Sequence, residues 1–78
     1  FIIYPNPNNG IFELSFNSNF NNVKIEVFDL LGKLIYTTSF KDYIINNEHQ
    51  IEMHSMSGTY ILSVTADEYH EDRLIFID

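Results

Sequence analysis

The chain has 78 residues and no cysteine, which is the size of one small domain that folds without disulfides or a cysteine-bound zinc ion. Its formal net charge is −7, and its four basic residues are scattered along the chain. This charge argues against a surface that binds nucleic acid or grips anionic lipid directly. The basic residues are Lys24, Lys33, Lys41 and Arg73.

The first part of the chain predicts two strands separated by a tight turn. Phe1 to Tyr4 is a short apolar strand that ends at Pro5-Asn6-Pro7, because proline cannot donate to a strand ladder. Asn8-Asn9-Gly10 predicts a turn. The next strand covers Ile11 to Asn17, and its core-facing residues are Phe12, Leu14 and Phe16. Since the apolar opening is too short for a signal peptide, we expect these 78 residues to be part of a longer protein.

The middle of the chain predicts a hairpin. A polar loop from Asn17 to Asn22 precedes an alternating strand, Val23 to Asp29, with Val23, Ile25 and Val27 on one face. Asp29-Leu30-Leu31-Gly32-Lys33 forms the turn, in which Gly32 is expected to have a positive φ. The return strand is Leu34 to Phe40, and its residues predicted to share one face are Leu34, Tyr36, Thr38 and Phe40.

The following segment is less regular. Tyr43-Ile44-Ile45 predicts a short strand and Asn46-Asn47 a turn. His49 to Met53 alternates weakly, with Ile51 and Met53 directed inward.

The strand from Thr59 to Val64 is expected to be the central one, because apolar residues occur on both of its faces. Gly58 is expected to make a sharp turn into it. An acidic connection, Asp67 to Asp72, then leads to an apolar terminal strand, Arg73 to Ile77. No helical periodicity persists, so the sequence predicts an all-β antiparallel sandwich of six or seven short strands without a helix.

The residues that could carry chemistry do not form a recognisable site. Ser55, His54 and Asp29 can be combined into a triad on paper, but no local hydrolase signature supports it. His49, His54 and His70 are instead interpreted as exposed loop histidines near turns. We therefore predict that the chain is not an enzyme and needs no cofactor.

Two other groups of residues allow a binding interpretation. The carboxylates Asp67, Glu68, Glu71 and Asp72 are the best candidates for a weak calcium site, although a solvated cluster that protects a sheet edge explains them better. Tyr4 and Tyr60 could belong to a sugar-binding face, but their alternation favours the core or its edge.

Taken together and in order, four segments carry a family resemblance. They are Tyr-Pro-Asn-Pro at residues 4–7 followed by Asn9-Gly10, Asp-Leu-Leu-Gly-Lys at 29–33, Met-His-Ser-Met-Ser-Gly-Thr-Tyr-Ile-Leu-Ser-Val at 53–64, and the short apolar strand at the end. This set closely resembles the type A C-terminal sorting domain of the type IX (Por) secretion system of Bacteroidetes. The resemblance covers nearly all of the chain and implies an immunoglobulin-like β-sandwich of about seven strands.

The resemblance implies that the chain is a targeting signal, and that residues 1–78 are a single C-terminal sorting domain of a larger cargo protein. It implies that the type IX machinery recognises the domain, namely an outer-membrane translocon, an outer-membrane β-barrel shuttle and a sortase-like protease that often removes it. The cargo would be secreted or left at the cell surface. The free domain would be a monomer that contacts no nucleic acid and does not insert into the membrane.

The resemblance also assigns roles to individual residues. The motif positions are Tyr4, Pro5, Asn6, Pro7, Gly10, Asp29, Gly32, Lys33, Gly58 and Tyr60. The segment implied to contact a partner is Arg73, Leu74, Ile75, Phe76, Ile77 and Asp78. Family members commonly carry lysines in and after the last strand, whereas this chain has Arg73 before it and Asp78 at its end.

Recognition by strand addition is one hypothesis for the terminal segment, with a free edge of the last strand pairing with a receptor. Leu74 and Phe76 then lie on one side and Ile75 and Ile77 on the other. In the simpler interpretation both pairs complete the core, and this is expected above all for Leu74 and Phe76. An immunoglobulin- or fibronectin-like accessory module, acting as a spacer or carbohydrate binder, is the alternative function.

Overall fold

Seven antiparallel strands and no helix make up the computed structural model, which describes residues 1–78. The strands are β1 (Ile2–Tyr4), β2 (Ile11–Ser15), β3 (Phe20–Phe28), β4 (Leu34–Tyr43), β5 (His49–Glu52), β6 (Gly58–Ala66) and β7 (Tyr69–Ile77). The all-β prediction is confirmed. The structure contains no helix long and apolar enough to cross a membrane.

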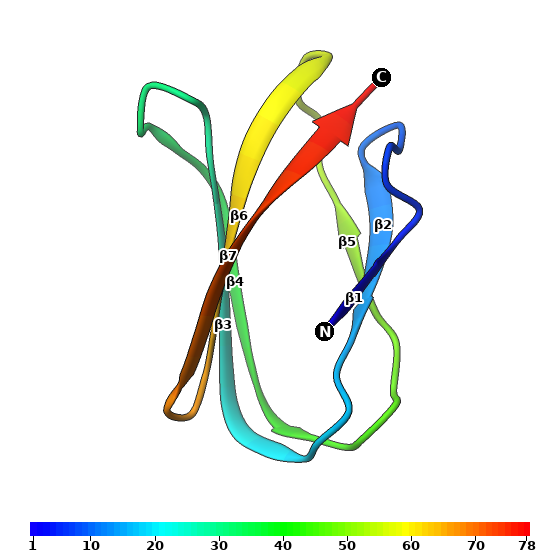
Figure 1. Cartoon of the computed structure of the whole chain (residues 1–78), viewed down its shortest axis with the longest axis vertical. Coiled ribbons are helices and arrows are strands. Elements are labelled where there is room, and N and C mark those ends of the chain that lie inside the picture. The colour runs from blue at the N-terminus through cyan, green and yellow to red at the C-terminus, as the bar shows by residue number, and fades with distance from the viewer.

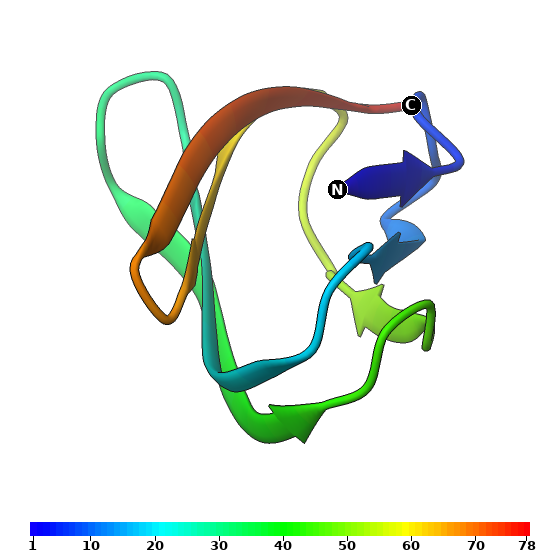
Figure 2. The same cartoon turned by 60° about the horizontal axis from the view of Figure 1, so that its bottom comes forward.

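The strands form two sheets that face one another (Figure 1). One sheet has three strands in the order β1-β2-β5, and the other has four in the order β4-β3-β6-β7. Figure 2 shows how the connections between β2 and β3, β4 and β5, and β5 and β6 cross from one sheet to the other. β6 is an inner strand flanked by β3 and β7, as expected for the central strand.

The core lies between the sheets and follows the strand alternation. Fifteen buried apolar residues form one cluster. The residues predicted to face inward in or directly after β2, β3 and β5 are all among them: Phe12, Leu14, Phe16, Val23, Ile25, Val27, Ile51 and Met53. On β6, Tyr60, Leu62 and Val64 are buried, whereas Ile61 is only half-buried because its face of the sheet is turned to solvent. The expectation that both faces of β6 are covered was therefore wrong.

Other strand boundaries differ from the prediction as well. Strand β3 begins at Phe20, inside the expected loop, and β7 begins at Tyr69, so the acidic connection shrinks to a turn at residues 67–68. The predicted strand at 43–45 is wrong: Tyr43 is the buried end of β4, and exposed Ile44 begins a turn in which the Asn47 amide donates to the Ile44 carbonyl.

A register shift changes the predicted face of Leu34. Between Val27 and Phe28 the pairing of β3 with β4 slips, so that Tyr36 lies opposite Val27 but Leu34 lies opposite Phe28. Leu34 therefore shares the outer face of the sheet with Phe28, while Tyr36, Thr38 and Phe40 remain on the inner face.

Candidate functional site

The terminal strand β7 is an edge strand of the four-stranded sheet, paired only with β6 on one side. Ile75 and Ile77 are buried in the core, whereas Leu74 is 51% exposed and Phe76 is 43% exposed. The expectation that Leu74 and Phe76 complete the core was wrong, because Tyr60 of β6 is an inward residue and lies opposite Ile75. The predicted recognition segment is thus divided between a buried and an exposed face.

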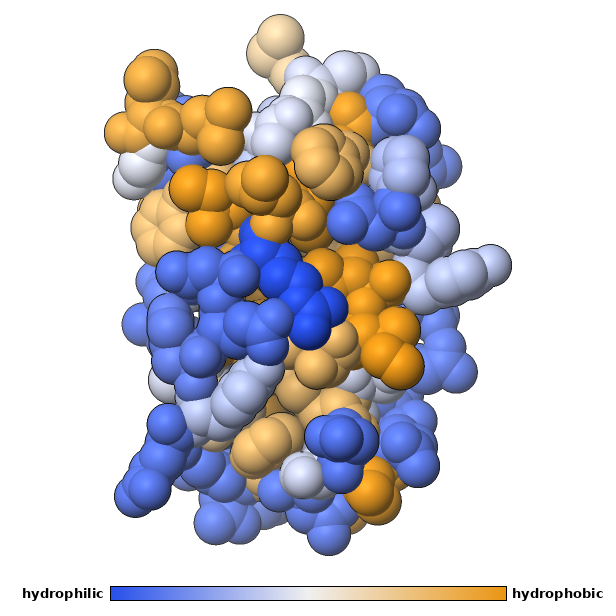
Figure 3. Space-filling model, in the orientation of Figure 1, coloured by the Kyte–Doolittle hydropathy of each residue, from blue (hydrophilic) through white to orange (hydrophobic).

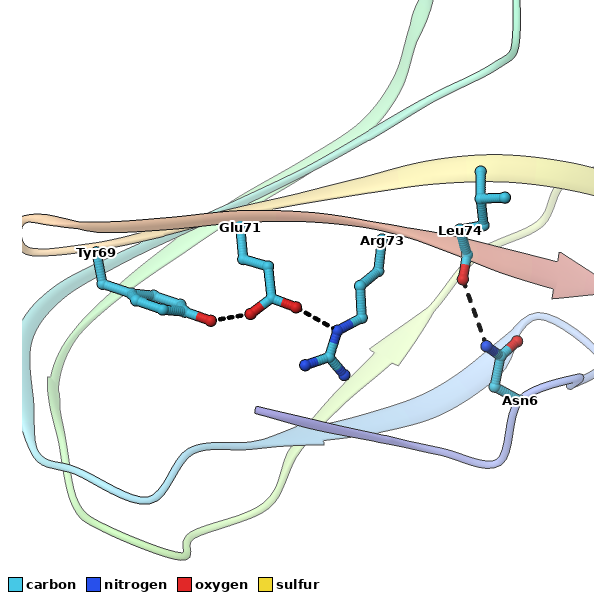
Figure 4. A network of polar contacts seen from close by, with 5 residues as sticks. All are labelled: Asn6, Tyr69, Glu71, Arg73 and Leu74. Atoms are coloured by element: carbon cyan, nitrogen blue, oxygen red, sulfur yellow. Dashed lines mark hydrogen bonds and ion pairs between the residues drawn. The ribbon is translucent and has the colours of Figure 1, made fainter.

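Asn6 and Asn8 close the outer backbone edge of this strand at its C-terminal end. The Phe76 amide donates to Asn6 Oδ1 at 3.0 Å, and Asn6 Nδ2 donates to the Leu74 carbonyl at 3.4 Å (Figure 4). The Asn8 amide donates to the Phe76 carbonyl at 3.0 Å, and the Asp78 amide donates to the Asn8 carbonyl at 2.7 Å. We call these two asparagines the edge clamp.

The turn that carries the edge clamp is held by its own side chains. Asn8 is 4% exposed, its Nδ2 donates to the Pro5 carbonyl at 3.1 Å, and its Oδ1 accepts from the Gly10 amide at 2.8 Å. The Gly10 carbonyl accepts from the Met53 amide at 2.8 Å. The segment from Pro5 to Gly10 therefore connects β7 of one sheet with the end of β5 in the other.

Gly10 is required by this close approach. Its φ is +102°, and a Cβ at this position would lie 2.6 Å from the Met53 carbonyl oxygen. Glycine alone combines that backbone conformation with that contact. The motif glycine is thus explained by geometry.

Polar side chains on the first half of β7 form a network with one another. Figure 4 shows Tyr69, Glu71 and Arg73 on the same side of the strand, where Tyr69 Oη donates to one carboxylate oxygen of Glu71 and Arg73 Nε donates to the other at 2.5 Å. The Arg73 guanidinium lies 4.0 Å from the centre of the Phe1 ring. Arg73 therefore links the terminal strand to the start of the chain.

This network shifts two pKa values in opposite directions. The hydrogen bond from Arg73, followed by that from Tyr69, lowers the pKa of Glu71 below its ordinary value of 4.5. The same bond to Glu71 raises the pKa of Tyr69 above 10.0, because ionised Tyr69 could no longer donate and would face a carboxylate.

The second motif segment forms a self-contained turn between β3 and β4. Asp29 Oδ1 accepts from the amides of Leu31 and Lys33, each at 2.9 Å, and the Asp29 carbonyl accepts from the Gly32 amide at 3.0 Å. Gly32 has a φ of +90°, in agreement with the prediction. Asp29 therefore acts as the cap of this turn and is not available to a triad.

The third motif segment leads into β6. Gly58 has a positive φ of 158°, a conformation that other residues rarely adopt, in agreement with the expected use of glycine at the entry to this strand. Tyr60 is buried, and its hydroxyl donates to the Met56 carbonyl at 2.5 Å, which fixes the loop before the strand. Tyr4 is 72% exposed, so its predicted place in the core or at its edge was wrong.

The histidines and acidic residues do not converge on a site. His49 is the first residue of β5, stacked on Phe40 with ring centres 4.0 Å apart, and His70 is the second residue of β7. Both lie close to turns, as predicted, but within strands rather than in loops. Burial lowers the pKa of His49 below 6.5. His54 is exposed and lies 3.9 Å from the Glu52 carboxylate, not beside Asp29.

The acidic hairpin is likewise engaged by its own neighbours. Asp67 accepts from the amides of Asn21 and Asn22 at 3.0 and 2.9 Å, and Asp72 lies 3.0 Å from His70. No three Asp, Glu or His side chains come close enough together to hold a metal ion. The four carboxylates therefore do not form the calcium site considered above.

The largest hollow is a shallow groove of about 380 Å³ on the outer face of β4, β3 and β6. Its lining is mostly polar and includes Lys24, Ser39, Lys41, Thr65 and Asp67. Although its volume is within the usual range of ligand sites, it lies at the opposite end of the sheet from Leu74 and Phe76.

Sequence reasoning missed the contacts of three residues, one in the edge clamp and two elsewhere in the sandwich. Asn8 is of a residue type that is common in any turn. Asp67 was grouped with the other carboxylates of the acidic connection, and Tyr43 was assigned to a separate short strand. The Tyr43 hydroxyl accepts from the Phe16 amide at 2.8 Å and donates to the Asn47 carbonyl. A lone Tyr beside an Asn-rich turn was the only available signal for that contact.

Comparisons with known proteins point to one family. Residues 2–78 match the family described as "Secretion system C-terminal sorting domain". The chain is also 37% identical over 70 residues to an ulvan lyase (NLR42) of Nonlabens ulvanivorans, a match that covers 85% of this chain and 12% of the lyase. The chain thus spans only a small part of that relative's length.

Proposed function

The chain belongs to the C-terminal sorting domains of the type IX (Por) secretion system, and we propose that it directs a cargo protein across the outer membrane of a member of the Bacteroidetes. The family is one of sorting signals rather than catalysts, and its members interact with the type IX machinery. The match over residues 2–78, which includes all seven strands, is the observation that carries the proposal.

The finer steps of export are part of the same proposal. An outer-membrane translocon and its β-barrel shuttle recognise the folded domain, and a sortase-like protease removes it from many cargo proteins. The cargo is then released or retained at the cell surface. In this scheme the domain is a substrate of the machinery and contributes no catalytic residue, which is consistent with its dispersed histidines and carboxylates.

The fold supports recognition of the whole domain rather than of a detached tail. The edge clamp and the terminal strand are 68–70 residues apart in sequence and share hydrogen bonds, so the first and last motif segments form one surface. Because this surface exists only in the folded domain, a partner that binds it does not bind the unfolded chain. This property suits a signal that is read after the cargo has reached the periplasm.

An export assay tests the sorting role. We would fuse residues 1–78 behind a Sec-targeted fluorescent protein and express the fusion in a type IX-competent strain and in a translocon-null strain. Reporter in the medium or at the surface of the competent strain alone is expected. Reporter retained in the periplasm of both strains would contradict sorting and favour the accessory-module alternative.

Deletion of residues 74–78 is expected to abolish export but is a poor test of recognition. It removes Ile75 and Ile77 from the core together with the exposed Leu74 and Phe76. Substitutions that leave the core intact separate recognition from folding.

A further inference from the structure

The edge clamp bonds the Leu74 carbonyl, the amide and carbonyl of Phe76, and the Asp78 amide, so these main-chain groups are not free to pair with a partner. A strand-adding partner needs unpaired donors and acceptors on the edge that it joins. The Phe76 amide and carbonyl are already bonded to Asn6 and Asn8, and the Asp78 amide is bonded to Asn8. At this end of β7, side chains are therefore the exposed feature.

Those side chains continue a row that crosses the whole outer face of the four-stranded sheet. Leu74 lies opposite Ile61, Ile61 opposite Phe28, and Phe28 opposite Leu34. We call Leu34, Phe28, Ile61 and Leu74 the outer apolar row. At about 4.8 Å per strand spacing the row spans roughly 15 Å, and Phe76 lies beside it on the same face of β7.

The outer apolar row ends beside a strongly exposed loop. Leu30 is 62% exposed and Leu31 is 96% exposed in the turn between β3 and β4. Figure 3 shows hydrophobic surface at the upper left, where Figure 1 draws the turn between β3 and β4, at the same end of the molecule as the C-terminal half of β7. Contiguous exposed apolar surface with a polar border is typical of interaction sites.

Carboxylates lie along the border of this surface, where Glu26 also lies 3.7 Å from the Lys24 ammonium and Asp72 lies 3.0 Å from His70. One step further along the strands, the outer face carries Glu26 and Asp72 on either side of Ser63. Asp78 follows Phe76 at the other border, and the net charge of the chain is −7. A partner with an apolar centre and basic residues around it would be complementary in both respects.

We propose that the outer apolar row, together with Phe76, is the surface on which a component of the type IX machinery docks, through an apolar patch bordered by basic residues. The inference rests on the proposed sorting function. The edge clamp holds Leu74 and Phe76 in line with the row, so the partner recognises side chains of a closed sheet and does not extend the sheet.

The export fusion described above provides the test, with variants that leave the core unchanged. The double variant Leu74→Ser with Phe76→Thr removes the exposed apolar groups of β7. The matched control, Ile2→Ser with Ile11→Thr, removes two exposed apolar residues from the outer face of the other sheet, where the wild-type side chains are 65% and 42% exposed. Circular dichroism and thermal unfolding of each purified fusion show whether it is folded.

We expect the β7 double variant to reduce exported reporter by about tenfold or more, the effect of losing anchor side chains from an interface. The control should be exported as well as the wild type, and the conservative pair Leu74→Met with Phe76→Leu should restore export. Wild-type export of the folded β7 variant, or equal loss in the control, would overturn the docking surface alone. Retention of the unmodified fusion would overturn the sorting function and the docking surface together.

Two further measurements separate this surface from the alternatives. If a partner added a strand to β7, Asn6→Ala would open the edge and increase export, whereas side-chain docking predicts unchanged or reduced export. Sedimentation of the purified wild-type chain should show a monomer. A dimer that the β7 double variant dissociates would assign the row to self-association and overturn the proposal.

Discussion

At the scale of single residues, Asn6 joins two parts of the chain that are far apart in sequence. Its side chain uses both its acceptor and its donor on the main chain of β7. A hydrophobic or charged side chain at this position could not do both. The asparagine between the two prolines is therefore as specific a requirement as the prolines themselves.

Replacing Asn6 by Ala is expected to destabilise the domain by about 1 kcal/mol, the net value of one or two exposed hydrogen bonds. Urea unfolding measures this loss, and hydrogen exchange should show faster exchange of the Phe76 amide. Asn9→Ala is the matched control, because Asn9 Oδ1 only accepts a local bond from Ile11 at 3.3 Å. An unchanged Phe76 exchange rate in Asn6→Ala would contradict the role of Asn6 in the edge clamp.

Two glycines with positive φ should respond differently to alanine. Gly32→Ala is expected to cost about 1–2 kcal/mol, for backbone conformation alone, because open space surrounds the position. Gly10→Ala should cost more, about 3 kcal/mol or above, since the new methyl group would also overlap the Met53 carbonyl. Thermal and urea unfolding of both variants measure the difference, and equal losses would show that the Met53 contact does not matter.

At the scale of strands, the inner and outer faces of β7 differ in kind. Ile75→Ala is expected to cost about 2–5 kcal/mol, because it opens a cavity in the core. Leu74→Ala, at the adjacent exposed position, should change stability by only about 0.5 kcal/mol. Urea unfolding with a constant slope measures both changes. A larger loss in Leu74→Ala than in Ile75→Ala would mean that Leu74, and not Ile75, faces the core.

The side-chain network on β7 predicts a pH dependence of stability. Because the folded state lowers the pKa of Glu71, its contribution is present above about pH 4.5, the ordinary value, and is lost as the pH falls through the lower folded value. Glu71→Gln should therefore lower the melting temperature at pH 7 but have little effect at the acidic end of the folded range. A difference that persists unchanged at low pH would contradict this origin.

Glu13 provides a control of opposite sign. A hydrogen bond with Glu48 raises the pKa of Glu13 above 4.5, so the folded state binds a proton more tightly than the unfolded chain does. Stability from this pair is present at acidic pH and is lost as the pH rises through the folded value. Glu48→Gln should thus remove a destabilising contact at pH 7, with the melting temperature rising rather than falling.

The accuracy of prediction differed between strands for a physical reason. In β3 apolar and polar residues alternate, so one face must be inside, and Val23, Ile25 and Val27 were placed correctly. Residues 74–77 are all apolar, so alternation carries no information about their faces. The pairing of Ile75 with the inward Tyr60 determines that Ile75 and Ile77, rather than Leu74 and Phe76, face the core. This pairing register cannot be predicted from residues 74–77 alone.

The candidate site was predictable in its residues but not in its contacts. The proline, glycine and asparagine positions of the first motif indicate a turn in any context. Their bonds to β7 join side-chain amides to main-chain groups 68–70 residues away, and such contacts leave no pattern of hydrophobicity or charge. Asn8 was missed because its bonds to β7 are made by its main chain, which carries no sequence signal.

At the scale of the whole molecule, the two sheets carry different surfaces. The outer face of the four-stranded sheet changes along its strands from the outer apolar row, through Glu26 and Asp72, to the polar groove with Lys24 and Lys41. The inner faces contain the core that is common to any sandwich of this kind. Recognition is therefore expected to be altered by substitutions on one face without loss of the fold.

The position of the edge clamp has a consequence for how the domain is made. Ribosomes synthesise residues 74–78 last among these 78, yet these residues complete the core and bind the turn formed near the beginning. An elongating chain that stops before Ile77 lacks a core side chain and one side of the clamp. The domain can thus adopt its final form only after residues 74–78 have been translated, so its folding reports that all 78 residues have been synthesised.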